Sequence, residues 1–477
     1  MEKIGKPEIT RTKINGPLRV HKENPRYFAD RDGKAVLLTG SHNWSNIQEI
    51  FSPDEEKEFD YRAYLEWLAG FGHNYTRGWH WEATHWNGFT RPGEFSPVRP
   101  LPYARTGPGT ALDDGPKFDL TRYNQNYFDR LRHRVIEAGD YGIYFSVMLF
   151  QGFSVDRRAE HPTDNPWDGH PFNRANNING IDGSAGNPEG GRAIHTLKIP
   201  EVTRLQEAYV RKIIDTVNDL DNVIYEIGNE HYEESFEWQC HMVNYIRGYE
   251  KTKPKQHLIG MTSGGGSNDA VTNSQLFSSP ADWIAPRQNN EDFSASYMDD
   301  PPVNNGRKVI VADTDHLWGV GGNIGWAWKS FMRGLHTALM DPYEPLHGLE
   351  NYAVWAPLNF RNHPAWDPVR RNMGYTRYFA ERVNLAAMIP RPELASSRYC
   401  LAQYGREYLV YVPQEKEICI DLGEGGGFSV VWLDTQTGML TEGDHITGKG
   451  ELKLNVPVTG SAVVLLRKKE RRSEKKG

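Results

Sequence analysis

The stretch Asn124–Phe150, NQNYFDRLRHRVIEAGDYGIYFSVMLF, decides the fold class because it holds one helix and the strand that follows it. Tyr127, Leu131 and Val135 recur at four-residue intervals, which places them on one face of a helix. After two glycines, Ile143–Phe150 is a nearly continuous apolar run. Strands without polar alternation are typical of parallel sheets that are covered on both faces. The stretch therefore predicts one unit of an α/β protein.

Similar units are predicted on both sides of this stretch. Upstream, an apolar strand at Ala35–Leu38 precedes a helix around Tyr61–Ala69 and a strand at His73–Gly78. Downstream, an apolar stripe from Val202 to Leu220 predicts a helix that leads into a strand at Val223–Ile227. The remaining predicted elements are strands at Leu258–Met261, Trp283–Ala285, Lys308–Ala312 and Thr337–Met340 and a last helix at Val369–Ala387.

The number of these units favours a barrel over an open sheet. About eight strands fit in roughly 350 residues, as in a (β/α)8 barrel. No GxGxxG or GxxxxGK[ST] phosphate loop follows the first strand, as a nucleotide-binding doubly wound sheet would suggest. We therefore predict an α/β fold with a (β/α)8 TIM barrel over residues 23–390, preceded by an N-terminal extension over residues 1–22.

The composition of the chain changes after Pro390-Arg391-Pro392. Short alternating runs then follow, separated by turns rich in Gly and Asp, which predicts a small antiparallel β-sandwich over residues 391–467. Its predicted strands are Tyr408–Val412, Ile418–Leu422, Phe428–Leu433, Leu452–Val456 and Ala462–Leu466. Residues 468–477 are expected to be a disordered basic tail.

Composition narrows the possible functions. The 55 basic and 62 acidic residues give a net charge of -7, which excludes a globally basic nucleic-acid binder. No apolar run approaches the roughly 20 residues of a membrane helix, so no membrane partner is expected. Three cysteines exclude a disulfide scaffold. With no apolar stretch of signal-peptide length at its start, the protein is either cytoplasmic or has lost a leader.

Carboxylates that follow two of the predicted strands are the candidate catalytic groups, since barrel enzymes hold catalytic residues where strands end. Val223–Ile227 leads to Asn229 and Glu230, and Lys308–Ala312 leads to Asp313 and Asp315. Two carboxylates at one bond are the minimum for glycoside hydrolysis: one protonates the leaving oxygen, and the other attacks the anomeric carbon or activates water. We predict Glu230 as acid/base and Asp313 as second carboxylate, with Asp315 as its rival.

Polar and aromatic residues at other strand ends are the candidate substrate-binding residues. An arginine there can bind a carboxylate in a bidentate manner and keep it ionised. Tryptophan offers an apolar face that suits a sugar. A single tryptophan is more often a packing residue, but the clustering of several at strand ends favours a substrate-facing role. The predicted substrate-binding residues are His42, Asn43, Trp44, Arg77, Trp79, His80, Trp81, Asn229, His316, Trp318 and Trp355.

These features resemble clan A of the glycoside hydrolases, related to the family 5 cellulases and the apiosidase-like family 140. Those enzymes are (β/α)8 barrels with a retaining acid/base and nucleophile at the ends of strands four and seven. The matching positions are Asn229-Glu230, Arg77 and Asp313, with Asn24–Trp44 similar to the opening of such enzymes and Lys117–Phe150 to their third unit. The resemblance implies a retaining hydrolase of poly- or oligosaccharides that needs no cofactor.

The C-terminal region carries a second resemblance. Glu393–Pro413 (ELASSRYCLAQYGREYLVYVP) and Val430–Gly438 (VVWLDTQTG) resemble the small C-terminal β-sandwich of the same group, sometimes labelled a collagen-binding domain. The sequence sets neither the sugar nor the oligomeric state.

One position departs from the family pattern. The strand-seven carboxylate is usually Glu, whereas Asp313 is shorter by one methylene, about 1.3–1.5 Å of reach. Retaining enzymes need carboxyl groups about 5–5.5 Å apart and inverting ones about 6.5–9.5 Å, so the shorter side chain could widen the gap.

Two other functions stay open at this point. A non-catalytic carbohydrate-binding barrel is compatible with Asp at the nucleophile position. A metal-dependent hydrolase could instead use Asp313, Asp315 and His316, since Asp-x-Asp-His is a credible ligand cluster. His80, Glu82 and His85 match no HExxH motif, and we predict no metal there.

Overall fold

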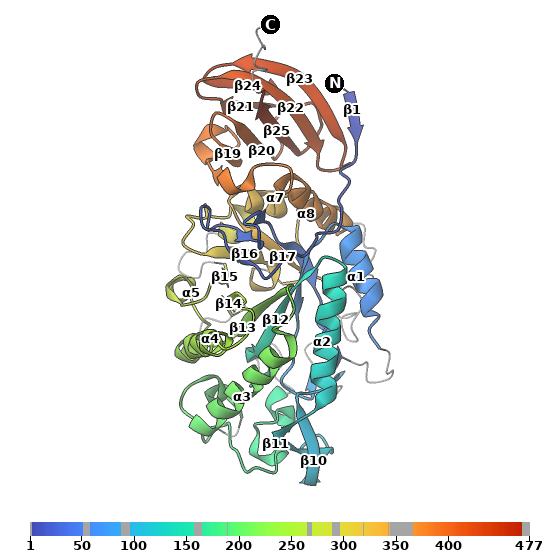
Figure 1. Cartoon of the computed structure of the whole chain (residues 1–477), viewed down its shortest axis with the longest axis vertical. Helices are drawn as coiled ribbons and strands as arrows, with labels where there is room; N and C mark the ends of the chain where they lie inside the picture. Colours follow the sequence, from blue (N-terminus) through green and yellow to red (C-terminus); the bar gives the residue numbers. More distant parts are fainter. Residues whose placement is uncertain are drawn as a thin grey trace.

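The computed structural model describes residues 2–50, 58–86, 96–156, 165–187, 189–264, 270–288, 296–317, 319–341, 343 and 366–469. Trp318 and Trp355 lie outside the described residues, as does most of the predicted basic tail. The molecule has two bodies, a barrel and a β-sandwich that lies beside helices α7 and α8 of the barrel (Figure 1). The first strand of the chain, β1, and the last, β25, both belong to the sandwich.

The prediction of a (β/α)8 barrel is confirmed. A closed barrel of parallel strands runs in the order β5 (Thr39–His42), β7 (Tyr75–Gly78), β12 (Tyr144–Gln151), β13 (Val223–Asn229), β14 (Ile259–Thr262), β15 (Trp283–Ala285), β16 (Val309–Asp313) and β17 (His336–Met340). The α-helices are α1 (Tyr61–Gly70), α2 (Gln125–Asp140), α3 (Pro200–Val217), α4 (Phe236–Glu250), α5 (Asn273–Ser278), α6 (Ser296–Asp299), α7 (Ile324–Met332) and α8 (Asp367–Ala380).

Strand alternation separates the barrel lumen from the helix layer. On β13, Tyr225 and Ile227 join the apolar cluster under the helices, which also contains Leu131 and Val135 of α2. Ile224 instead packs with lumen residues such as Tyr144. Because strand side chains alternate, residues 226 and 228 continue the face of Ile224 toward the carboxyl end of the barrel.

The first barrel strand differs from the prediction. Ala35–Val36 is β4 of a small antiparallel sheet with β2 (Arg19–Val20) and β3 (Phe28–Ala29), and the barrel strand is the polar Thr39–His42 that follows. A Cβ at Gly40 would lie 1.8 Å from the Tyr75 carbonyl oxygen, so the two backbones are in close contact. This segment is therefore the barrel strand because it packs closely on β7, although its residues are not apolar. The last helix also differs from the prediction, because α8 ends at Ala380 and the predicted helix extended to Ala387.

Two further small sheets lie outside the closed barrel. They are β6 (Glu49–Ile50), β8 (His85–Trp86) and β9 (Ser96–Arg99), which form one sheet, and the hairpin of β10 (Tyr103–Thr110) and β11 (Pro116–Tyr123). This hairpin projects at the end of the molecule opposite the sandwich (Figure 1).

The C-terminal region forms the predicted antiparallel sandwich. One sheet has the order β1 (Glu2–Gly5), β23 (Leu440–Gly448), β22 (Gly426–Asp434), β25 (Ala462–Lys468), β20 (Glu407–Val412), β19 (Cys400–Gln403) and β18 (Ile389–Pro390). The other pairs β21 (Glu417–Asp421) with β24 (Glu451–Asn455). The sequence did not predict β18, β19 or β23. It also did not predict that residues 2–5 of the N-terminal extension join this sheet by pairing with β23.

The sandwich shares an apolar core with the barrel. Trp328 of α7 and Phe379 of α8 pack in one cluster with Tyr411 of β20 and Leu433 of β22. Trp328 stacks on Tyr411 with ring centroids 6.3 Å apart. In the part of the chain that the structure describes, no helix is long and apolar enough to span a membrane.

Candidate active site

Arg77 of β7 is the centre of a buried charge network inside the carboxyl end of the barrel. Its guanidinium donates to Glu226 from Nε (3.0 Å) and Nη2 (2.5 Å), and Nη2 also donates to Asn229 Oδ1 (2.8 Å). Nη1 donates to Asp313 Oδ2 (3.0 Å) and to Asp315 Oδ2 (3.1 Å). A guanidinium has five N–H donors. All five are therefore occupied, so Arg77 serves as an internal counter-ion with no donor left for a ligand.

Burial and charge act in opposite directions on Arg77. Burial alone would lower the pKa of this guanidinium, but the carboxylates of Glu226 and Asp313 outweigh burial and raise the pKa well above its ordinary value. Arg77 is 1% exposed, so its charge is permanent and little screened by solvent. The network therefore holds one fixed positive charge among three carboxylates.

Glu226 is a site residue that sequence reasoning missed. It lies in the middle of β13 with no measurable exposure, and its carboxylate binds Arg77 through both oxygens. A signal was available, because Glu226 is a carboxylate that interrupts an apolar strand. A buried charge needs a partner, and the structure shows that this partner is Arg77 of β7.

Asp313 is the last residue of β16, and the structure places it beside both Arg77 and His42. Its Oδ1 lies 3.2 Å from His42 Nε2 and accepts the backbone N–H of Asp315 (3.0 Å). Burial would raise the pKa of Asp313, but the charges of His42 and Arg77 outweigh it and hold this pKa well below its usual range. Asp313 is therefore an ionised carboxylate near neutral pH.

Asp315, the rival candidate for the second carboxylate, lies just beyond the strand that carries Asp313. β16 ends at Asp313, and Asp315 lies in a 3-10 helix (Thr314–His316) whose N-cap is Asp313. The tight turn still brings the Asp315 carboxylate to the same guanidinium nitrogen that binds Asp313. Both predicted candidates for the second carboxylate are thus in the network.

Glu230 follows β13 directly and takes a strained backbone conformation. Its φ is 52°, in the left-handed region that non-glycine residues rarely adopt. The Glu230 carbonyl oxygen lies against Gly152, where a Cβ would be 2.3 Å away. Non-glycine residues in this region often mark functional sites. The neighbouring Asn229 is bound to Arg77, so Glu230 follows a residue in direct contact with the network.

The predicted aromatic residues near the strand ends pack together. Trp79 stacks on His42 with centroids 5.4 Å apart, and the Arg77 guanidinium lies 5.1 Å over its ring. Trp44, Trp79 and Trp81 are each 3% exposed and share one cluster with Trp86. The structure thus brings these tryptophans to the network, where they form its apolar wall.

The remaining predicted residues are divided between the network and its surroundings. His316 is 4% exposed, and burial lowers its pKa. Within the described residues, neither ring nitrogen of His316 has a hydrogen-bond partner. Asn43 accepts the N–H of Ser45 (2.8 Å) and so shapes the loop after β5. His80 turns toward the helices, where its Nδ1 lies 2.8 Å from the Tyr127 hydroxyl.

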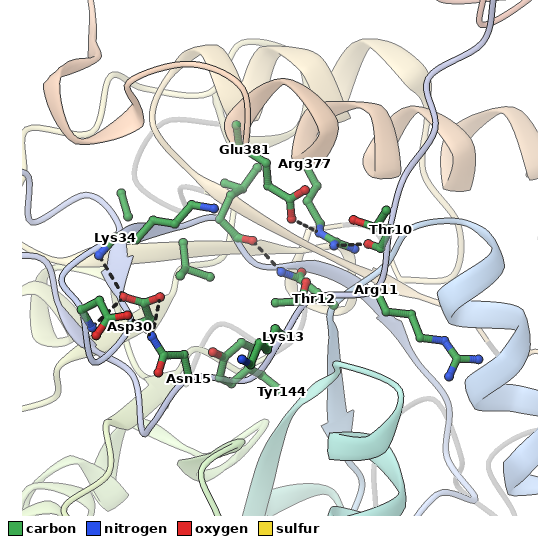
Figure 2. Close-up of a pocket in the computed structure, with 16 residues that line it drawn as sticks. Thr10, Arg11, Thr12, Lys13, Asn15, Asp30, Lys34, Tyr144, Arg377 and Glu381 are labelled. Carbon is green, nitrogen blue, oxygen red and sulfur yellow. Dashed lines mark hydrogen bonds and ion pairs between the residues drawn. The ribbon is translucent and has the colours of Figure 1, made fainter.

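A separate cavity of about 400 Å³ lies at the opposite end of the barrel (Figure 2). Leu37, Asn74 and Tyr144, which precede or begin β5, β7 and β12, line it together with residues of the N-terminal segment and α8. Arg377 of α8 crosses it to the Thr10 carbonyl oxygen and pairs with Glu381. Chemistry in such barrels occurs where the strands end, so this cavity is not the candidate active site.

The described residues contain no group of three or more His, Cys, Asp or Glu side chains arranged to hold a metal ion. Asp313 and Asp315 instead share one guanidinium nitrogen of Arg77. The geometry therefore gives no support to a metal centre built from these residues and His316.

Comparisons with known proteins agree with the fold. A model of a domain of unknown function (DUF6298) matches residues 90–299. No curated protein matches the chain. A solved glycoside hydrolase is 13% identical, with 97% of this chain and 99% of that chain covered and a TM-score of 0.60. A glycoside hydrolase family 5 protein from Bacteroides vulgatus ATCC 8482 is 14% identical, with 97% and 95% covered and a TM-score of 0.62.

The chain has the fold of these glycoside hydrolases. Both alignments cover 97% of it, so the likeness includes the barrel and the sandwich. At this level of identity the likeness describes the fold, and the argument for activity depends on the site.

Proposed function

We propose that the protein hydrolyses O-glycosidic bonds in poly- or oligosaccharides with two carboxylates. Glu230 acts as acid/base and Asp313 as nucleophile. One observation carries the proposal: the Arg77 guanidinium lies 2.8 Å from Asn229, which precedes Glu230, and 3.0 Å from Asp313. It thereby ties the ends of β13 and β16 to each other, as a mechanism with two opposed carboxylates requires. The shared fold with glycoside hydrolases supports the same function.

The charge state of Asp313 supports its role as the second carboxylate, which attacks the anomeric carbon in a retaining enzyme or activates water in an inverting one. A nucleophilic carboxylate must be ionised, and Arg77 with His42 keeps the pKa of Asp313 well below its usual range. Attack on the anomeric carbon would give a glycosyl-enzyme ester, which water activated by Glu230 would hydrolyse. Asp315 remains the rival, but its backbone N–H already donates to Asp313 and its carboxylate has no histidine partner among the hydrogen bonds of the described residues.

Activity assays on a broad panel of aryl glycosides and oligosaccharides test this proposal. Glu230→Gln and Asp313→Asn should each reduce turnover by about 100-fold or more while the proteins stay folded. Asp315→Asn should cost less than Asp313→Asn. The anomer of the first-formed product, followed by NMR, distinguishes retention from inversion. Full activity of Glu230→Gln on a substrate with a poor leaving group would sink the assignment.

The panel also separates the alternatives. Binding of a glycan with no turnover on any substrate would favour a non-catalytic carbohydrate-binding barrel. Loss of activity on treatment with a chelator, restored by a metal ion, would favour a metal-dependent hydrolase.

A further inference from the structure

A second buried cluster, centred on Glu82 in the loop after β7, lies outside the residues used above. Glu82 is 7% exposed and accepts hydrogen bonds from Nε2 of His170 (3.2 Å) and Nε2 of His195 (3.0 Å). Its Oε1 also accepts the backbone N–H of Gln151 at 2.6 Å. One carboxylate therefore fastens the end of β12 to two points of the long segment between β12 and α3.

The cluster reaches Glu230 through His195. The His195 ring contacts the ring of His231, with centroids 4.5 Å apart. The His231 ring in turn covers Gly228, where a Cβ would lie 2.2 Å from its Cε1 atom. His195 and His231 both pack on Trp238 of α4, with ring centroids 4.7 and 5.4 Å away. The residue after Glu230 is thus clamped between its own strand, α4 and His195.

The end of β12 reaches Glu230 from the other side. Gln151, whose N–H binds Glu82, is in register with Asn229 in the parallel β12–β13 pair. The next residue, Gly152, is the one that lies against the Glu230 carbonyl oxygen. Both neighbours of the strained Glu230 backbone, Gly152 and His231, are therefore linked to Glu82 by one or two contacts.

We infer that Glu82 is a positioning residue that, through Gln151 and His195, holds Glu230 in its left-handed conformation at the end of β13. The inference rests on the proposed function of Glu230 as acid/base. A left-handed non-glycine residue is costly, by about 1–3 kcal/mol, so it persists only where surrounding contacts fix it. Loosening those contacts displaces the Glu230 carboxyl group from the oxygen that it must protonate.

The groups that face Glu82 include several other titratable side chains. His80, His170 and His195 lie around its carboxylate. The negative charge of Glu82 also contributes to raising the pKa of three nearby tyrosines, Tyr103, Tyr127 and Tyr209. Burial would raise the pKa of Glu82, but His195 and His170 outweigh burial and hold it well below its usual range. Glu82→Gln therefore removes a charge as well as a hydrogen-bond acceptor, while it keeps the side-chain shape.

The test compares Glu82→Gln with the wild-type protein on two glycosides of one sugar, a phenyl and a 2,4-dinitrophenyl glycoside. The phenyl leaving group needs protonation by a general acid, and the dinitrophenyl group does not. We expect kcat/KM to fall by about 10- to 100-fold on the phenyl glycoside and by less than about threefold on the dinitrophenyl glycoside. A merely structural loss of folded enzyme lowers both values equally, and that outcome would overturn the inference.

Glu250→Gln is the matched control. Glu250 is 1% exposed, and it accepts from the His257 backbone N–H at 2.7 Å and pairs with His257 Nδ1 at 2.8 Å. It ends α4 at the opposite end of the barrel, so its loss should affect stability without any dependence on the leaving group. If Glu230→Ala itself shows no such dependence, the proposed function fails. If Glu230→Ala shows it and Glu82→Gln does not, only the inference about Glu82 fails.

Hydrogen exchange gives a readout that needs no substrate. In Glu82→Gln, the amides of residues 228–232 should exchange at least about tenfold faster than in the wild type, because local opening near the cluster costs less free energy. Glu250→Gln should leave these amides unchanged. His195→Gln, which keeps Glu82 but removes the ring against His231, should give the same local acceleration. Unchanged exchange in both Glu82→Gln and His195→Gln would contradict the inference.

Discussion

Arg77 Nη1 lies 3.0 Å from Asp313 Oδ2, and both side chains are 1% exposed. This contact joins the second and seventh strands of the barrel across its lumen, more than two hundred residues apart in the sequence. Because all five donors of the guanidinium have acceptors within the protein, the arginine fixes the position and charge of the carboxylates.

Arg77→Lys should separate the charge of this residue from its geometry. Lysine keeps one positive charge but offers at most three donors for five positions. The pKa of Asp313 should then rise toward its ordinary value of about 3.9, so the acidic limb of the kcat/KM profile should move to higher pH. We expect kcat to fall by about 100-fold. Arg132→Lys, which changes an exposed pair with Asp219, is the control and should leave the pH profile unchanged. An acidic limb that does not move in Arg77→Lys would contradict this account.

Glu226→Gln should destabilise the protein because an amide NH2 would then face guanidinium N–H groups. Leaving buried donors unpaired costs about 1–3 kcal/mol of unfolding free energy, which urea denaturation measures. Glu417→Gln removes the surface pair with Lys453, in which the Glu417 side chain is 50% exposed, and should change stability by less than about 0.5 kcal/mol. Equal effects of the two substitutions would show that Glu226 is not a structural partner of Arg77.

The charge of the site should select against acidic sugars. Three described carboxylates, Glu226, Asp313 and Asp315, surround one arginine whose donors are all occupied. We therefore expect a neutral glycoside to be hydrolysed with a kcat/KM at least about tenfold above that of the matching uronide with the same leaving group, a difference of about 1.4 kcal/mol. Preference for the uronide would mean that a cation outside this network binds the substrate.

Buried neutral histidines should make stability depend on mildly acidic pH. Burial lowers the pKa of His73 and His336 to about 3 and that of His80 to about 4. In the unfolded chain the pKa of a histidine is about 6.5. Below that pH the unfolded state binds more protons than the folded state does, so the unfolding free energy falls. Each histidine costs about 1.4 kcal/mol per pH unit between about pH 6.5 and its folded value.

Urea unfolding at pH 7.5, 6.5 and 5.5 measures this dependence. The unfolding free energy should fall on acidification, and the fall should be smaller in His80→Gln, which has one fewer buried histidine to titrate. Stability that is constant over this range would show that these histidines are solvated in the folded protein.

The shared core between the two bodies gives a further prediction. Trp328 packs between α8 and the sandwich sheet, and its Nε1 donates to Asn372, whose amide donates to the Thr435 carbonyl oxygen. Trp328→Ala should cost about 3–5 kcal/mol and should split calorimetric unfolding into separate barrel and sandwich transitions. Trp328→Phe, which keeps most of the apolar volume, should preserve a single transition. A single transition at unchanged temperature in Trp328→Ala would argue against coupling through this residue.

The residues that sequence analysis located best are those whose position follows from local periodicity. Repeated apolar runs and helical stripes predicted the barrel, and the end of each strand pointed to Arg77, Asn229 and Asp313, because strand direction determines where a following residue lies. Local patterning failed where a contact distant in sequence decides the structure. Because Gly40 has no Cβ, the backbone of Tyr75 can pack directly against it. This close contact places the polar segment Thr39–His42 in the barrel as its first strand.

Charge pairing also lay beyond the sequence. Glu226 and Glu82 are buried carboxylates whose partners come from other strands and loops, and no spacing rule relates them to Arg77, His170 or His195. The sequence by itself determined the barrel, the sandwich and the two candidate strand ends, because those depend on periodicity within single elements. Only the tertiary structure decided which groups share the lumen, because burial and pairing depend on elements that meet only when the barrel closes.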